Sequence, residues 1–177
     1  MTALNRYVDR LRATFGPIPH FDPFDGGTNA RILVLLETPG PSNASVRFTS
    51  RDNPTGTAKT LRALSSLARI NRNDTVIWNA VPWVLDRRGK RLRVPSPSDL
   101  KTAATLLPEL LALLPNLGSV ILAGKTAGRL ETEIARIAGS LKILRMPHPS
   151  PTYVNTSPSA FASMIATFKR AAASALR

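Results

Sequence analysis

The sequence predicts an α/β protein in which helices cover both faces of a mainly parallel, four-stranded sheet. Four short runs rich in Val, Ile and Leu have the length of fully buried strands. They cover residues 31–36, 75–79, 119–123 and 142–146. Segments with helical periodicity alternate with these runs, which is the pattern of a three-layer α/β/α architecture with parallel strands. A chain of 177 residues fits one domain that spans residues 1–177.

The helical segments carry apolar residues three and four positions apart. They cover residues 4–15, 55–68, 98–114 and 127–138, and a last segment that begins at residue 158. Ser98 and Ser157 are expected to cap the third and the last of these helices, because a serine hydroxyl accepts hydrogen bonds from the first N–H groups of a helix.

The composition favours a cytoplasmic protein with a polyanionic partner. No stretch of 18 or more apolar residues appears, and the first residues lack the layout of a signal peptide. We therefore expect no membrane contact and a prokaryotic type of cytoplasmic location. The formal charge is +13, with basic residues clustered at 87–93 and flanking a loop at Arg47 and Arg51. Basic residues that only aid solubility remain the alternative.

The residue types available argue against metal and cofactor chemistry. Cysteine is absent and only two histidines occur, His20 and His148. That composition excludes disulfides and cysteine-ligated iron–sulfur clusters and disfavours a zinc site. No Walker-type or G-x-G-x-x-G loop is present. We expect no metal and no cofactor.

Chemically useful residues follow three of the predicted strands. Glu37 and Thr38 open a Pro/Gly turn after the first strand, Asn79 ends the second, and His148 lies between prolines after the fourth. Ligands of open α/β sheets bind beyond the carboxyl ends of the strands. The loop 37–54 is also long enough to be functional.

These loops resemble the motifs of the uracil-DNA glycosylase superfamily. Residues 36–40 (Leu-Glu-Thr-Pro-Gly) match its first motif, residues 148–152 (His-Pro-Ser-Pro-Thr) match its second, and residues 78–81 repeat its strand that ends in Asn. The resemblance covers about residues 31–168. It implies a monomeric, monofunctional enzyme that flips uracil out of single- or double-stranded DNA and hydrolyses the N-glycosidic bond with water. Whether other deaminated bases are removed stays open.

The resemblance also implies roles for single residues in base recognition and cleavage. His148 would donate a hydrogen bond to uracil O2, where negative charge develops. The Asn79 amide would pair with uracil O4 and N3–H, and Phe48 would stack on the flipped base. The alternatives are a histidine that bonds its own loop, an asparagine that caps a turn, and an aromatic anchor for the long loop.

Two positions depart from the best-known branch of the family. Thr38 stands where that branch has the Asp that positions the attacking water, so Thr38 or the neighbouring Glu37 would do this here, with Asp52 as a further candidate. Gly40 stands where that branch has a Tyr that excludes thymine. Exclusion of thymine must then come from elsewhere, or specificity is broader.

DNA contacts are expected from the second-motif loop and from one turn. Tyr153 is the candidate wedge that fills the gap left by the flipped base, although a tyrosine there could instead fold into the core. Ser150, Pro151, Thr152 and Lys125 would contact the DNA backbone. Two other readings stay open: a uracil-DNA binding protein without cleavage, and an unrelated α/β enzyme that acts on a small anion.

Overall fold

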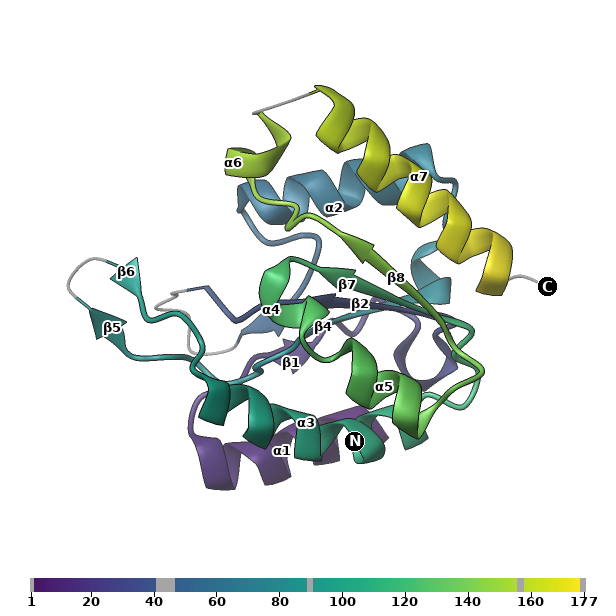
Figure 1. Ribbon diagram of the computed structural model, residues 1–177. Coiled ribbons are helices and arrows are strands. Elements are labelled where there is room, and N and C mark those ends of the chain that lie inside the picture. The colour runs from purple at the N-terminus through teal and green to yellow at the C-terminus, as the bar shows by residue number, and fades with distance from the viewer. Residues whose placement is uncertain (1, 41–46, 89–90, 156–157, 176–177) are drawn as a thin grey trace.

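A parallel four-stranded sheet forms the centre of the molecule (Figure 1). The computed structural model describes residues 2–40, 47–88, 91–155 and 158–175. The strand order is β4-β2-β7-β8, and every neighbouring pair is parallel. The strands are β2 (Ile32–Leu36), β4 (Thr75–Asn79), β7 (Ser119–Ala123) and β8 (Lys142–Met146). The predicted parallel α/β fold is confirmed.

Helices cover both faces of this sheet (Figure 1). One face carries α1 (Ala3–Phe15), α3 (Pro97–Ala112) and α5 (Glu131–Ile137). The other carries α2 (Gly56–Leu67) and α7 (Pro158–Ala175). Two four-residue helices, α4 (Lys125–Gly128) and α6 (Pro151–Val154), follow the carboxyl ends of β7 and β8. Loops and these two short helices therefore occupy that end of the sheet.

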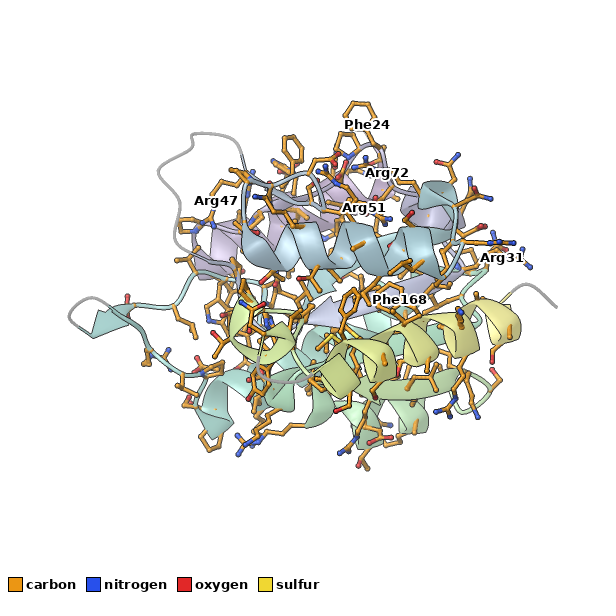
Figure 2. The ribbon with its side chains drawn as sticks, turned by 90° about the horizontal axis from the view of Figure 1, so that it is seen from above. Phe24, Arg31, Arg47, Arg51, Arg72 and Phe168 are labelled. Atoms are coloured by element: carbon orange, nitrogen blue, oxygen red, sulfur yellow. The ribbon has the colours of Figure 1, made fainter. Side chains whose placement is uncertain are left out.

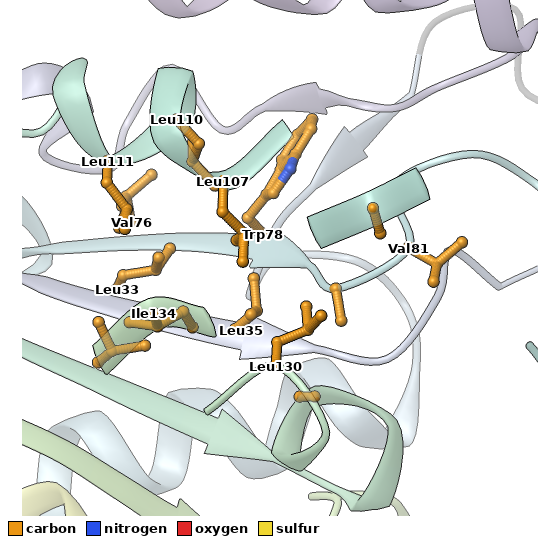
Figure 3. Close-up of a cluster of buried hydrophobic side chains, with 14 of the residues drawn as sticks. Leu33, Leu35, Val76, Trp78, Val81, Leu107, Leu110, Leu111, Leu130 and Ile134 are labelled. Atoms are coloured by element: carbon orange, nitrogen blue, oxygen red, sulfur yellow. The ribbon is translucent and has the colours of Figure 1, made fainter. Parts of the chain in front are cut away.

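Alternation along the strands divides the core into two clusters. Leu33 and Leu35 of β2 point to the α1/α3/α5 side, whereas Ile32 and Val34 point to the α2/α7 side. Figure 3 shows the first cluster, with β2 and β4 side chains packed against Leu107 and Leu110 of α3 and Ile134 of α5. Each such fully buried side chain contributes roughly 1.5–3 kcal/mol, so the sheet is a firm platform for its loops.

Two helix boundaries differ from the sequence prediction. The N-cap of α3 is Ser96, not Ser98: the Ser96 hydroxyl accepts from Asp99 N at 3.2 Å, and the Asp99 carboxylate accepts from Ser96 N at 2.6 Å. This reciprocal capping box satisfies two N–H groups at once, which a cap at Ser98 would not. The predicted helix 127–138 is two helices, α4 and α5. The predicted cap Ser157 lies outside the described residues.

Two short strands that the sequence did not indicate form a separate two-stranded sheet beside β4. β1 (His20–Phe21) pairs in parallel with β3 (Phe48–Thr49), His20 opposite Phe48 and Phe21 opposite Thr49. Phe21 stacks on Trp78 of β4, with ring centroids 3.8 Å apart. The stack fixes β1, and with it β3, beside the end of β4.

The basic segment 87–93 contains a hairpin of β5 (Arg87–Arg88) and β6 (Arg91–Leu92). Figure 1 shows it projecting from the body of the molecule. In the part of the chain that is described, none of the helices combines the length and apolarity needed to cross a membrane.

Candidate functional site

A cavity of about 230 Å³ lies beyond the carboxyl ends of β2 and β4. We call it the first cavity. Five residues singled out in the sequence line it: Thr38, Gly40, Phe48, Asn79 and His148. They come from three strand ends and one long loop, so the fold brings together residues that are up to 110 positions apart in the sequence (148 − 38).

Asn79 presents a buried amide in this cavity. It is the last residue of β4, its side chain is 4% exposed, and its Nδ2 donates to Thr49 Oγ1 at 3.2 Å. A side-chain amide has two N–H groups and an acceptor oxygen. It can therefore hold Thr49 and still offer a donor and an acceptor to a planar ligand.

Phe48 forms part of the cavity wall and is 39% exposed. The ring of His20 lies beside it, with centroids 6.1 Å apart, and Arg12 Nη1 lies 2.6 Å from His20 Nε2. Burial and the charge of Arg12 lower the pKa of His20, so its ring is neutral at pH 7. His20, which no motif indicated, thus packs a neutral ring against Phe48.

His148 lies where the first cavity meets a second cavity of about 790 Å³. It sits in the loop between β8 and α6, and it lines both spaces. Burial lowers the pKa of His148 below its ordinary value of 6.5, and the nearby negative charge of Glu37 acts in the opposite direction. The imidazole is therefore neutral at pH 7 and can donate one N–H.

We expect this lowered pKa to be visible in the pH dependence of any reaction that uses His148. Burial moves the titration of His148 below its ordinary range, so the single-turnover rate should be level above neutral pH and should fall only as the pH is lowered through the reduced pKa. The measurement is a pH profile of that rate at saturating protein. A transition centred at or above pH 7 that disappears in His148→Gln would contradict this expectation.

Glu37 lines the second cavity and not the first. Its Oε1 accepts from Thr126 N at 3.0 Å. Gly124 makes room for it: the φ of Gly124 is +98°, and a Cβ there would lie 2.6 Å from Glu37 Oε1. Among the described residues, no carboxylate lines the first cavity.

The residues expected to contact DNA surround the second cavity or lie close to it. Lys125 and Tyr153 line it, and Tyr153 is 45% exposed rather than folded into the core. Ser150 precedes α6 as its N-cap residue, and Pro151 and Thr152 are exposed at the start of that helix. A Cβ at Gly56 would lie 2.1 Å from Pro151 Cγ, so glycine at this position lets α6 pack on α2.

Asp52, the further candidate for holding a water, is bound elsewhere. Its carboxylate forms ion pairs with Arg62 at 2.9 Å and with Arg72 at 2.7 Å, and it does not line the first cavity. The hydrogen bond from Arg72 is the largest cause that lowers the pKa of Asp52. Of the three carboxyl or hydroxyl candidates for water, Thr38 is the one that lines the first cavity.

The two arginines beside the first loop have different positions (Figure 2). Arg51 is 5% exposed; it pairs with Asp25 at 3.3 Å and donates to Ser65 Oγ and Thr75 Oγ1. The expectation that Arg51 belongs to a surface for polyanions is therefore wrong, because its charge is compensated inside the fold. Arg47 lines the first cavity and donates to the Gly40 carbonyl.

Sequence reasoning missed Arg47 and Thr49 as cavity residues. Neither lies in a motif, and both reach the cavity through the pairing of β1 with β3. That pairing joins two-residue strands, which are too short to leave a periodic pattern in the sequence.

Comparisons with known proteins bear on the same part of the chain. The family model described as "Uracil DNA glycosylase superfamily" matches residues 23–172. No curated protein gives a significant match. The chain is similar to a solution NMR structure from Methanosarcina acetivorans, described as a candidate uracil DNA glycosylase. Sequence identity is 20% and the TM-score is 0.47, over 81% of this chain and 92% of that one.

Proposed function

This chain belongs to the uracil DNA glycosylase superfamily, and we propose that it removes uracil from DNA by hydrolysing the N-glycosidic bond. The observation that carries the proposal is the first cavity, on which Thr38, Phe48, Asn79 and His148 converge. Its volume of about 230 Å³ is below the roughly 300–1,000 Å³ of sites for drug-sized ligands. It suits a single planar base that has left the DNA stack.

The geometry supports a separate role for each of these side chains. Phe48 stacks on the base, the Asn79 amide pairs with O4 and N3–H, and the neutral imidazole of His148 donates to O2 as the C1′–N1 bond breaks. The bonding electrons leave with uracil as an anion, and a donor placed where charge develops stabilises that state. Water held by the Thr38 hydroxyl adds to C1′ of the sugar and releases a proton to solvent.

Glu37 completes this arrangement from the second cavity. Its carboxylate is close enough to His148 to influence the histidine pKa, which supports a role for Glu37 as the negative charge beside the sugar. Such a charge favours the oxocarbenium-like sugar that forms in glycoside hydrolysis. The protein would act as a monomer in the cytoplasm, with no metal or cofactor.

The test is direct excision of uracil. Excess protein is incubated with a single-stranded uracil oligonucleotide, a G·U duplex and matched thymine strands, and abasic sites are then cleaved with alkali. We expect cleavage at uracil and none at thymine. A gel shift with the same strands measures binding. A protein that shows no cleavage at uracil and no preferential binding of uracil strands would refute the proposal.

Replacing Asn79 should alter the choice of base. In Asn79→Asp the side chain loses the N–H that faces uracil O4, and the ionised carboxylate repels that oxygen. Lost or unsatisfied buried hydrogen bonds of this kind are worth about 1–3 kcal/mol. We therefore expect the preference for uracil over cytosine, measured as a ratio of single-turnover rates, to fall roughly tenfold or more.

The matched control for this substitution is Asn29→Asp. Asn29 is exposed in the 3₁₀ helix η1 (Gly27–Asn29), outside both cavities. The Asn29→Asp substitution makes the same change of charge and should leave the preference for uracil over cytosine unchanged. If the Asn79→Asp protein kept the wild-type preference for uracil, Asn79 would have no role in base recognition.

One observation favours a second function, that of a uracil-DNA binding protein without efficient cleavage. Among the described residues the first cavity has no carboxylate, and Glu37 is held toward the second cavity by Thr126 N–H. The excision assay separates the two functions. Uracil-dependent binding without cleavage would favour the binding protein, whereas cleavage would make Glu37→Gln and Thr38→Ala the next variants.

A further inference from the structure

We propose that Thr49 is a positioning residue that anchors the Asn79 amide where it can pair with the base in the first cavity. The inference rests on the proposed function, because it assumes that the Asn79 amide reads a base. It assigns a role to a residue that lies in none of the motifs.

The contact is shielded from water. Thr49 is 7% exposed and Asn79 is 4% exposed, and Asn79 Nδ2 donates to Thr49 Oγ1 at 3.2 Å. Both residues line the first cavity. A buried amide N–H without an acceptor is unfavourable, so the Thr49 hydroxyl anchors the Asn79 side chain on its own side of the cavity.

Thr49 can do this because its backbone is fixed on both sides. Phe21 pairs with Thr49 in the β1–β3 ladder and stacks on Trp78, the residue before Asn79. On the other side of Thr49, the Ser50 hydroxyl donates to the Asp22 carboxylate, which is also bound by Arg72 at 2.5 Å. The hydroxyl that meets Asn79 therefore has little freedom to move.

An anchored amide keeps its remaining polar groups aligned with the edge of the base. Uracil presents an N3–H donor next to the O4 acceptor, and the Asn79 side chain has an acceptor oxygen and a second N–H to match them. The Thr49 hydroxyl can accept a hydrogen bond or donate one, so it anchors the amide without choosing between its two orientations. Thr49 thus contributes to holding uracil in line for cleavage.

Two variants isolate the hydroxyl. Thr49→Val keeps the β-branched shape that suits β3 and removes the acceptor, whereas Thr49→Ser keeps the hydroxyl and removes a methyl group. We expect Thr49→Val to lower the single-turnover rate on uracil roughly tenfold or more. The dissociation constant for uracil DNA should stay near the wild-type value. Thr49→Ser should keep the wild-type rate.

The result that would overturn the inference is a Thr49→Val protein with the wild-type rate. Equal losses in Thr49→Val and Thr49→Ser would also overturn it, because they would assign the effect to packing of the methyl group. Thermal unfolding of both variants shows whether the fold is kept.

A second measurement tests the contact without any reaction. The Asn79 side-chain NH₂ signals in a ¹⁵N-labelled protein are identified by their loss in Asn79→Asp. In Thr49→Val these protons should exchange with water faster than in the wild type and in Thr49→Ser. Unchanged exchange in Thr49→Val would overturn the inference whatever the activity. Absence of uracil excision by the wild type, with the exchange difference present, would instead refute the proposed function and leave the contact established.

Discussion

His148→Ala is expected to lower single-turnover uracil excision by roughly 10²–10³, the usual effect of removing one donor to a developing anion. The expectation follows from the position of the imidazole, which lines both cavities and is kept neutral by burial. An alanine leaves the departing uracil O2 without this N–H. Because the donor acts on charge that appears in the transition state, the rate constant should fall much more than the affinity for uracil DNA.

The measurement is a single-turnover time course at saturating protein, with a gel shift on the same strand. His148→Gln is the matched variant, since its amide retains an N–H on a side chain of different reach, and it should recover part of the loss. Excision by His148→Ala at the wild-type rate would refute the role of His148. Equal losses of affinity and rate would point instead to a damaged second-motif loop.

Arg51→Met should destabilise the fold by about 3–5 kcal/mol, the usual consequence of removing one member of a buried ion pair. Arg51 follows β3 in the chain, and its guanidinium pairs with Asp25, whose side chain is fully buried. Arg72 also contacts Asp25, at 3.1 Å. Without Arg51, the Asp25 carboxylate keeps one partner in place of two, and the Thr75 and Ser65 hydroxyls each lose one donor while they still donate to the Arg72 and Leu61 carbonyls.

Urea unfolding at 25 °C measures this loss. The matched control is Arg62→Met, which removes an exposed ion pair with Asp52 and should change stability by less than about 1 kcal/mol. A double variant, Arg51→Met with Asp25→Asn, should recover part of the loss because no buried charge then lacks a partner. Equal stability of the Arg51→Met and Arg62→Met proteins would contradict the assignment.

The pH dependence of the Arg51→Met effect has a definite sign. Burial raises the pKa of Asp25 from 3.8 to about 6, and Arg51 acts against that rise. A raised folded-state pKa contributes stability below the unfolded pKa, and that contribution is lost as the pH rises through the folded one. The loss in Arg51→Met should therefore be larger at pH 8 than at pH 5, where a neutral Asp25 needs the arginine less.

The sequence by itself determined the elements of the sheet and the identity of the strand-end residues. Runs such as Ile32–Leu36 are recognisable because burial on both faces of a parallel strand demands continuous apolar residues. The Pro/Gly turn at Pro39 and Gly40 ends a strand by local chemistry alone. Thr38, Asn79 and His148 could be named in advance because each follows such a run.

The tertiary structure alone decided which of those residues share a space. Glu37 and Thr38 are adjacent in sequence, yet Glu37 lines the second cavity and Thr38 the first. The group that binds the Glu37 carboxylate, Thr126 N, lies 89 residues away in the sequence. Nothing local encodes that choice.

The tertiary structure also changed the interpretation of Arg51 and Thr49. The sequence places Arg51 in a polar loop and suggests a surface charge, but Asp25 and Thr75 meet it only after the sheet has formed. Thr49 has no motif, and it reaches Asn79 because Phe21 stacks on Trp78. Local patterns report burial and turns, whereas the pairing of distant polar groups depends on the packing that brings them together.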